Sequence, residues 1–121
     1  MIEVQNSKIY DLEERTFQFA KNVRLFIKSI SRNISNLEDG KQLIRSSGSI
    51  GANYIEANEP LGKKDFLMRI RISRKESKES IYWLKLIDTT NSNELEKLRI
   101  NLIKEATELL RILSSIIRKS E

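Results

Sequence analysis

Apolar residues recur every three or four positions along most of the chain, a spacing that places them on one side of an α-helix. Four segments carry this pattern, at about residues 11–32, 41–58, 63–89 and 93–118. Residues 33–40 are predicted to form a frayed turn and loop, with Gly40 as the helix breaker. Residues 1–10 are predicted to form a flexible tail, and Asp11 is predicted to be the N-cap of the first helix. No stretch alternates as a half-buried strand would. The pattern predicts one domain over residues 1–121, an all-α, antiparallel up-down four-helix bundle.

Two glycines interrupt the second predicted helix, where each costs roughly 1 kcal/mol relative to alanine. Ile44, Gly48, Gly51 and Ile55 share one line on the helix surface. A Walker-type phosphate loop needs a preceding strand and a lysine directly after the last glycine, but Ala52 follows Gly51. The letters GSIG match the loop of the KH nucleic-acid module, which contains strands that are not predicted here. We therefore expect a groove into which a facing helix sinks, with ligand binding as the alternative.

Small polar residues also follow the inner line of the third predicted helix, at Ser73, Ser77 and Ser80. We expect them to pack closely against the small residues of the second helix, with their hydroxyls bonded back to backbone carbonyls. The alternative is a polar bundle interior that binds a ligand. Gly48, Gly51, Ser73 and Ser77 are therefore our candidate helix-packing residues.

Basic side chains form two lines in a chain whose formal net charge is +5. The line on the third helix has a spacing of seven, which keeps it in one stripe, and Arg74 and Lys75 widen it. Phe17 lies on the line of the first helix. The two lines are Lys64, Arg71, Lys78 and Lys85, and Lys21, Arg24, Lys28 and Arg32. Such ribs can follow a phosphate backbone, and an exposed aromatic ring can stack on a base. The alternative is a solvated face that keeps the bundle soluble, with Phe17 in a subunit contact.

A second apolar stripe on the third helix contains Met68, Ile72, Trp83 and Leu86. A monomeric bundle needs one buried stripe per helix, so a second one indicates a subunit interface, which we expect Trp83 to anchor. Phe17 and Glu79 are assigned to the same interface. Glu79 is expected to pair with an arginine across the contact or on a nearby helix; an unpaired, exposed glutamate is the alternative.

Several kinds of chemistry are excluded by composition. The chain has no cysteine and no histidine, which removes disulfides, thiolate metal sites and imidazole acid–base catalysis. Glu76 with Glu79 and Glu105 with Glu108 have i, i+3 spacing, but di-iron bundles complete such pairs with histidine. We expect no enzyme activity, metal, cofactor or small-molecule substrate. No apolar run approaches the ~20 residues of a membrane span and no signal-peptide core is present, so we expect a soluble, cytoplasmic protein without a membrane partner.

Two motifs carry a family resemblance, RSSGSIGANYIEANE and KKDFLMRIRISRKESKESIYWLKLI. The recognisable parts are SIGAN followed by Glu56, and Glu79 followed by YWL. From YDLEERT to the C-terminal helix, the chain resembles the four-helix-bundle family first known as the 23S rRNA intervening-sequence protein. The resemblance implies small bacterial bundles that assemble into homopentamers. It also implies kinship with the accessory protein of diversity-generating retroelements, a basic pentameric barrel that binds nucleic acid, and it brings no enzymatic activity.

The residues and the resemblance together predict a homo-oligomer, with the number five coming from the resemblance alone. We expect this oligomer to bind RNA or DNA through its basic ribs with low sequence specificity. The rival hypothesis is a protein-interaction scaffold whose working surface is apolar and for which nucleic acid is irrelevant. The third hypothesis is a purely structural protein, or one carried by a selfish genetic element, with no assignable activity.

Overall fold

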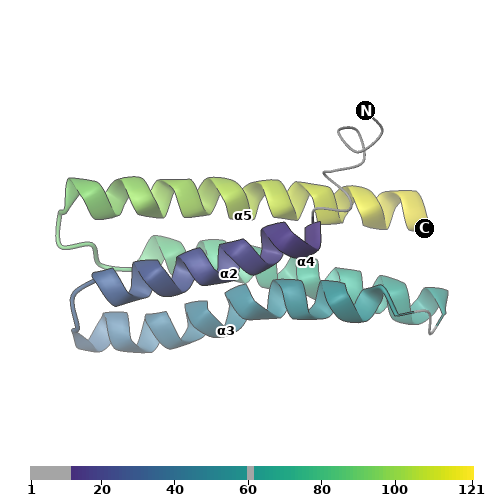
Figure 1. The fold of residues 1–121 in the computed structure, drawn as a ribbon, viewed down its shortest axis with the longest axis horizontal. Helices are drawn as coiled ribbons and strands as arrows, with labels where there is room; N and C mark the ends of the chain where they lie inside the picture. Colours follow the sequence, from purple (N-terminus) through teal and green to yellow (C-terminus); the bar gives the residue numbers. More distant parts are fainter. Residues whose placement is uncertain (1–11, 60–61) are drawn as a thin grey trace.

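The computed structural model of the protein describes residues 12–59 and 62–121, and these ranges contain four α-helices and no strand. The helices are α2 (Leu12–Ser29), α3 (Ile34–Ala57), α4 (Lys63–Leu86) and α5 (Asn93–Ser120). They lie along the long axis of the molecule and pack side by side (Figure 1). The all-α prediction of four packed helices is confirmed. The predicted N-cap at Asp11 and the predicted tail over 1–10 lie outside the described residues.

The helices pack in a ring in the order α2, α3, α4, α5, with α5 closing back onto α2. The most extensive backbone contact joins α3 to α4, and the least extensive joins α5 to α2. Within the described ranges, no close backbone contact joins α2 to α4 or α3 to α5, so these pairs are the diagonals of the bundle. This order decides which rows of surface side chains, each following one helix, lie on neighbouring helices.

The interior is an apolar core to which every helix contributes, and burial of such side chains is the main stabilising term in folding. The largest fully buried apolar side chains are those of Phe19, Leu12, Leu43, Ile50, Ile70, Leu84, Ile87, Leu109, Leu113 and Val23. None of the helices in the described ranges combines the length and the apolar character needed to cross a membrane.

The start of α3 corrects the sequence prediction, because the helix begins at Ile34 and not at residue 41. The side chain of Asn33 caps it by accepting a hydrogen bond from the backbone N–H of Asn36 at 2.8 Å. Gly40 is therefore buried inside a helix and does not break one. A Cβ at Gly40 would lie 3.4 Å from Cδ1 of Ile27, an ordinary van der Waals distance, so Ile27 of α2 packs over this part of α3. The cap and this packing offset the low helix propensity of Gly40, on which the prediction of a loop over residues 33–40 relied.

Two other helix ends fall short of their predicted positions, since α2 ends at Ser29 instead of residue 32 and α4 at Leu86 instead of residue 89. The connections that follow are tied together by the buried Asn36. Its amide donates to the carbonyls of Ser31 and Asp88, at 3.0 and 2.9 Å, and accepts from the N–H of Asp88 at 2.8 Å. These bonds hold the connection after α2 against the connection after α4.

Arg99 of α5 holds the C-terminal end of α4, where helix carbonyls have no intrahelical partner. Its guanidinium donates to the carbonyl oxygens of Leu84, Lys85 and Ile87, and to the carboxylate of Glu96. These bonds fix α5 against α4 at this end of the bundle.

Candidate nucleic-acid and subunit interfaces

The basic line of α4, which we call the α4 rib, consists of Lys64, Arg71, Lys78 and Lys85, and all of its members are exposed. At 1.5 Å per residue it extends for about 32 Å. Arg71 pairs with Glu121, the C-cap residue of α5, at 2.7 Å, so at this point the rib adjoins the end of α5. Within the part of the chain that the structure describes, the three lysines of the rib form no ion pair with a carboxylate. Of the flanking cations, Lys75 is exposed and Arg74 is half-buried.

The basic line of α2 lies apart from the α4 rib, because α2 and α4 are diagonal in the bundle. Lys21, Arg24 and Lys28 are exposed on α2, but Arg32 lies beyond the end of that helix. The Lys21 ammonium is 5.6 Å from the ring centroid of Phe17, within the range of a cation–π contact. The two predicted ribs therefore do not form one continuous surface.

The sequence analysis missed a third basic line, on α5, that the structure places beside α4. This α5 rib consists of Lys97, Lys104, Arg111 and Arg118, spaced by seven and all exposed. Its members form no ion pair within the described ranges. The seven-residue spacing is present in the sequence, but the prediction for this segment rested on its apolar arc alone. Since α4 and α5 are neighbouring helices, we group the eight cations of their two ribs and call them the basic face.

The glycine line of α3 faces α2, and its two glycines have different surroundings. A Cβ at Gly51 would lie 2.8 Å from Oγ1 and 3.1 Å from Cβ of Thr16, so α2 approaches this point closely. A Cβ at Gly48 would meet only the guanidinium end of Arg24, at 3.4 Å. Between the helices lies an open groove of about 490 Å³ that contains Gly48, Gly51 and the Phe17 ring. The glycines therefore serve both a close contact and a surface groove.

The serines of the α3–α4 contact are fully buried and hydrogen-bonded. Ser73 Oγ donates to the carbonyl of Ile50 at 2.7 Å, and Ser77 Oγ donates to the carbonyl of Ser73 at 3.1 Å. The hydroxyls of Ser46 and Ser80 are 2.9 Å apart. Each of these four hydroxyls is thus engaged in a hydrogen bond within or between α3 and α4, as helix packing requires.

The outer apolar stripe of α4 is only partly exposed. Met68 and Leu86 are exposed, at 46% and 45% of their surface, whereas Ile72 and Trp83 are half-buried. Trp83 packs against the core of its own bundle. A subunit contact on this stripe would therefore use the edge of the indole and the two exposed side chains.

Glu79 has its partner within the same chain. Its carboxylate accepts a hydrogen bond from Arg45 of α3 at 3.0 Å, and Arg45 also reaches both oxygens of Glu76, each at 3.3 Å. The hydrogen bond to the buried Glu76 carboxylate, and then the charges of both acids, raise the pKa of Arg45 above its ordinary value. This cluster fixes α3 to α4 beside the apolar stripe.

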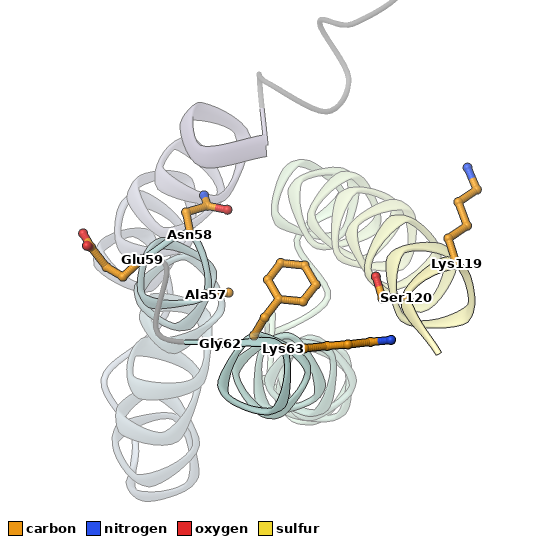
Figure 2. Close-up of a pocket in the computed structure, with 8 residues that line it drawn as sticks. Ala57, Asn58, Glu59, Gly62, Lys63, Lys119 and Ser120 are labelled. Atoms are coloured by element: carbon orange, nitrogen blue, oxygen red, sulfur yellow. The ribbon is translucent and has the colours of Figure 1, made fainter.

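A hollow of about 740 Å³ lies near the end of the bundle where α3 ends and α4 begins. Figure 2 shows that Glu59 and Lys119 point away from it and from each other, while Lys63 extends from α4 toward α5. The charged side chains of Glu59 and Lys119 thus do not converge in the hollow as the polar groups of a small-molecule site would. In the described ranges, no group of three or more acidic residues is placed to hold a metal ion.

Comparisons with known proteins agree with this geometry. The family model described as 23S rRNA-intervening sequence protein matches residues 8–115. A similar solved structure is that of a protein with unknown function from the S23 ribosomal protein family of Bacteroides thetaiotaomicron VPI-5482. It shares 29% sequence identity with this chain at a TM-score of 0.71, and the alignment covers 88% of this chain and 97% of that one. No curated protein matches the sequence.

Proposed function

The chain belongs to the 23S rRNA-intervening sequence protein family, and from this premise we propose that it is a non-enzymatic homo-oligomer that binds RNA or DNA through its basic ribs. Binding has low sequence specificity, because lysine and arginine contacts to phosphates carry no base information. The protein acts in the bacterial cytoplasm, where it needs no cofactor or small-molecule substrate.

The observation that supports this proposal most directly is the basic face. Eight exposed cations follow two neighbouring helices, and seven of them have no carboxylate partner in the described part of the chain. Each phosphate contact releases condensed counterions, so a row of such cations gives affinity that falls with salt. The α2 line, with Lys21, Arg24 and Lys28, adds a weaker second contact on another side of the bundle.

Assembly is the second part of the proposal. We infer an antiparallel up-down course for the bundle, supported by contacts that join Asn36, early in α3, to Asp88 beyond α4, and Ile50, later in α3, to Ser73 near the middle of α4. The subunit interface uses the outer stripe of α4, with Met68, Leu86 and the edge of Trp83. A ring of five, as the family resemblance implies, multiplies a weak single-subunit contact by symmetry.

The test compares three variants that each replace four cations by glutamine and so lower the formal net charge of a subunit from +5 to +1. One variant changes the α4 rib, one the α5 rib, and one Lys21, Arg24, Lys28 and Arg32 of the α2 line. Fluorescence anisotropy against short RNA and DNA, over a salt series, gives affinity and salt dependence. We expect the α4 and α5 variants to lose most of the affinity and to have a shallower salt slope, by about one unit for each phosphate contact removed.

The α2 variant serves as the control, because its charge change is identical. Equal losses in all three variants would show that net charge alone drives binding and would refute a defined basic face. An unchanged affinity and slope in all three would refute nucleic-acid binding through the ribs. Circular dichroism and sedimentation of each variant establish that fold and assembly are intact.

The rival function, a protein-interaction scaffold, is favoured by the α2–α3 groove. Its wall includes the exposed ring of Phe17, at 56% of its surface, and the exposed Ile55. A partner protein recovered by pull-down that persists through nuclease treatment and high salt would favour this function. Loss of the partner on nuclease treatment would favour nucleic-acid binding.

A further inference from the structure

One aromatic ring lies on the basic face without having been assigned any role. Tyr82 of α4 is exposed over 58% of its surface. Lys78 is four residues before it and Lys85 three residues after it, so helical spacing places both beside it on the same side of α4. Rises of about 6 Å and about 4.5 Å along the axis separate the ring from these two lysines. The order along the helix is cation, ring, cation.

Neighbouring groups hold this arrangement in place. The ring of Tyr82 meets that of Trp83 edge-on, with centroids 5.0 Å apart and an interplanar angle of 77°. Such a T-shaped contact fixes one ring while leaving much of the other accessible. The nearest carboxylate in the sequence, Glu79, is held by Arg45 of α3. The charge of Glu79, three residues before Tyr82, is therefore offset by the arginine with which it pairs.

A nucleotide in a single strand has a matching order, since its base is flanked by a phosphate on each side along the chain. In a duplex the bases are stacked and paired inside, so a side chain that approaches the backbone cannot stack on them. An unpaired base, in contrast, offers a free face to an aromatic ring, and this stacking tolerates any base. The alternation of cation and ring on α4 fits a single strand better than a duplex.

Building on the proposed function, we propose that the basic face binds single-stranded RNA or DNA in preference to duplex, and that Tyr82 stacks on an unpaired base. Lys78 and Lys85 hold the flanking phosphates. The rest of the α4 and α5 ribs holds more distant phosphates of the same strand. Tyr82 is thus the residue that discriminates single strands from duplexes.

The experiment measures anisotropy of three fluorescent probes with the same number of phosphates per strand. These are a short oligo-dT, its duplex with oligo-dA, and an abasic strand that lacks the bases. The proteins are the full wild-type chain, Tyr82→Phe and Tyr82→Ala. The control is Leu25→Ala, which removes a side chain of equal exposure, 58%, from α2.

We expect Tyr82→Ala to bind oligo-dT at least about fivefold more weakly than wild type, and Tyr82→Phe and Leu25→Ala to bind it as wild type does. All four proteins should bind the abasic strand equally. The chain has a single tryptophan, so the fluorescence of Trp83 reports stacking at its neighbour. It should change with oligo-dT and not with the abasic strand.

The outcomes separate this inference from the proposed function. If wild type binds no probe even at low salt, the proposed function fails and the inference fails with it. If wild type binds with a steep salt dependence but Tyr82→Ala binds oligo-dT equally well, only the role of Tyr82 is overturned. A changed oligomer mass of Tyr82→Ala in sedimentation would place the ring in a subunit contact and would also overturn it.

Discussion

Replacing Gly51 by alanine tests the close contact between α2 and α3. The change gains about 1 kcal/mol in helix propensity. Against this, the new Cβ would lie 2.8 Å from Oγ1 and 3.1 Å from Cβ of Thr16. Thr16 is buried, and its hydroxyl donates to the carbonyl of Glu13 at 2.9 Å, so it cannot easily rotate away. Overpacking of this kind costs about 1–3 kcal/mol, so Gly51→Ala should lower the free energy of unfolding by up to about 2 kcal/mol.

Gly48→Ala provides the matched control, less than one helical turn away. Its Cβ would approach only the guanidinium end of Arg24, at 3.4 Å, and that flexible side chain can move. The propensity gain then remains, and this variant should be more stable than wild type by about 0.5–1 kcal/mol. The same chemical change is thus expected to have opposite signs at two neighbouring positions. Urea unfolding, at one fixed subunit concentration because assembly contributes to stability, measures both.

A double-mutant cycle with Thr16→Ala attributes the cost to its source. Removing the Thr16 hydroxyl should make the added methyl group of Gly51→Ala less costly, giving a coupling of at least about 0.5 kcal/mol. If Gly48→Ala and Gly51→Ala stabilise equally, α2 does not approach α3 at Gly51 and the reasoning is refuted. A coupling of zero would show that any cost comes from elsewhere than Thr16.

Three further variants test local features of the fold. Gly40→Ala should stabilise the protein by up to about 1 kcal/mol in urea unfolding, because the site is inside α3 with space for a methyl group; destabilisation would contradict the observed helix start. Arg45→Met should cost about 1–3 kcal/mol by leaving the carboxylate of Glu76, 5% exposed, without its cation, and adding Glu76→Gln should recover part of this loss. Hydrogen bonds from Arg99 and Thr89 lower the pKa of Glu96 below its ordinary value. The stabilisation from these bonds is therefore present above about pH 5 and is lost as pH falls through the lowered pKa, so Glu96→Gln should lose less stability than wild type when melts are followed to acid pH.

Helix number and apolar faces were predictable from the sequence because the 3.6-residue period is strong in all four segments. The start of α3 was not, since a glycine and several polar residues outweighed the period between residues 34 and 40. What decides that boundary is a cap at Asn33 and a tertiary contact between Gly40 and Ile27. Asparagine is a residue type that favours the N-cap, but the contact requires knowledge of how α2 lies on α3.

Basic ribs were partly predictable in the same way. Spacing by seven revealed the line on α4, and the same count would have revealed Lys97, Lys104, Arg111 and Arg118 on α5. Which ribs become neighbours depends on the order of helices around the bundle, and helical periodicity within single segments does not contain that order. The partner of Glu79 was unpredictable for the same reason, because Arg45 is on another helix, 34 residues away along the chain.

Acidic residues explain why cations dominate one face of a protein with 17 carboxylates and only a modest net charge. Glu105 of α5 pairs with Arg15 at the α2 contact, and Glu76 and Glu79 of α4 pair with Arg45 at the α3 contact. These three carboxylates are thus used in contacts with α2 and α3, whereas Glu121 pairs with Arg71 of the α4 rib. Salt screens such short, partly buried ion pairs less than it screens the attraction between exposed lysines and phosphate. The fold should therefore tolerate salt concentrations at which the basic face has lost most of its attraction for phosphate, which separates the electrostatics of folding from those of binding.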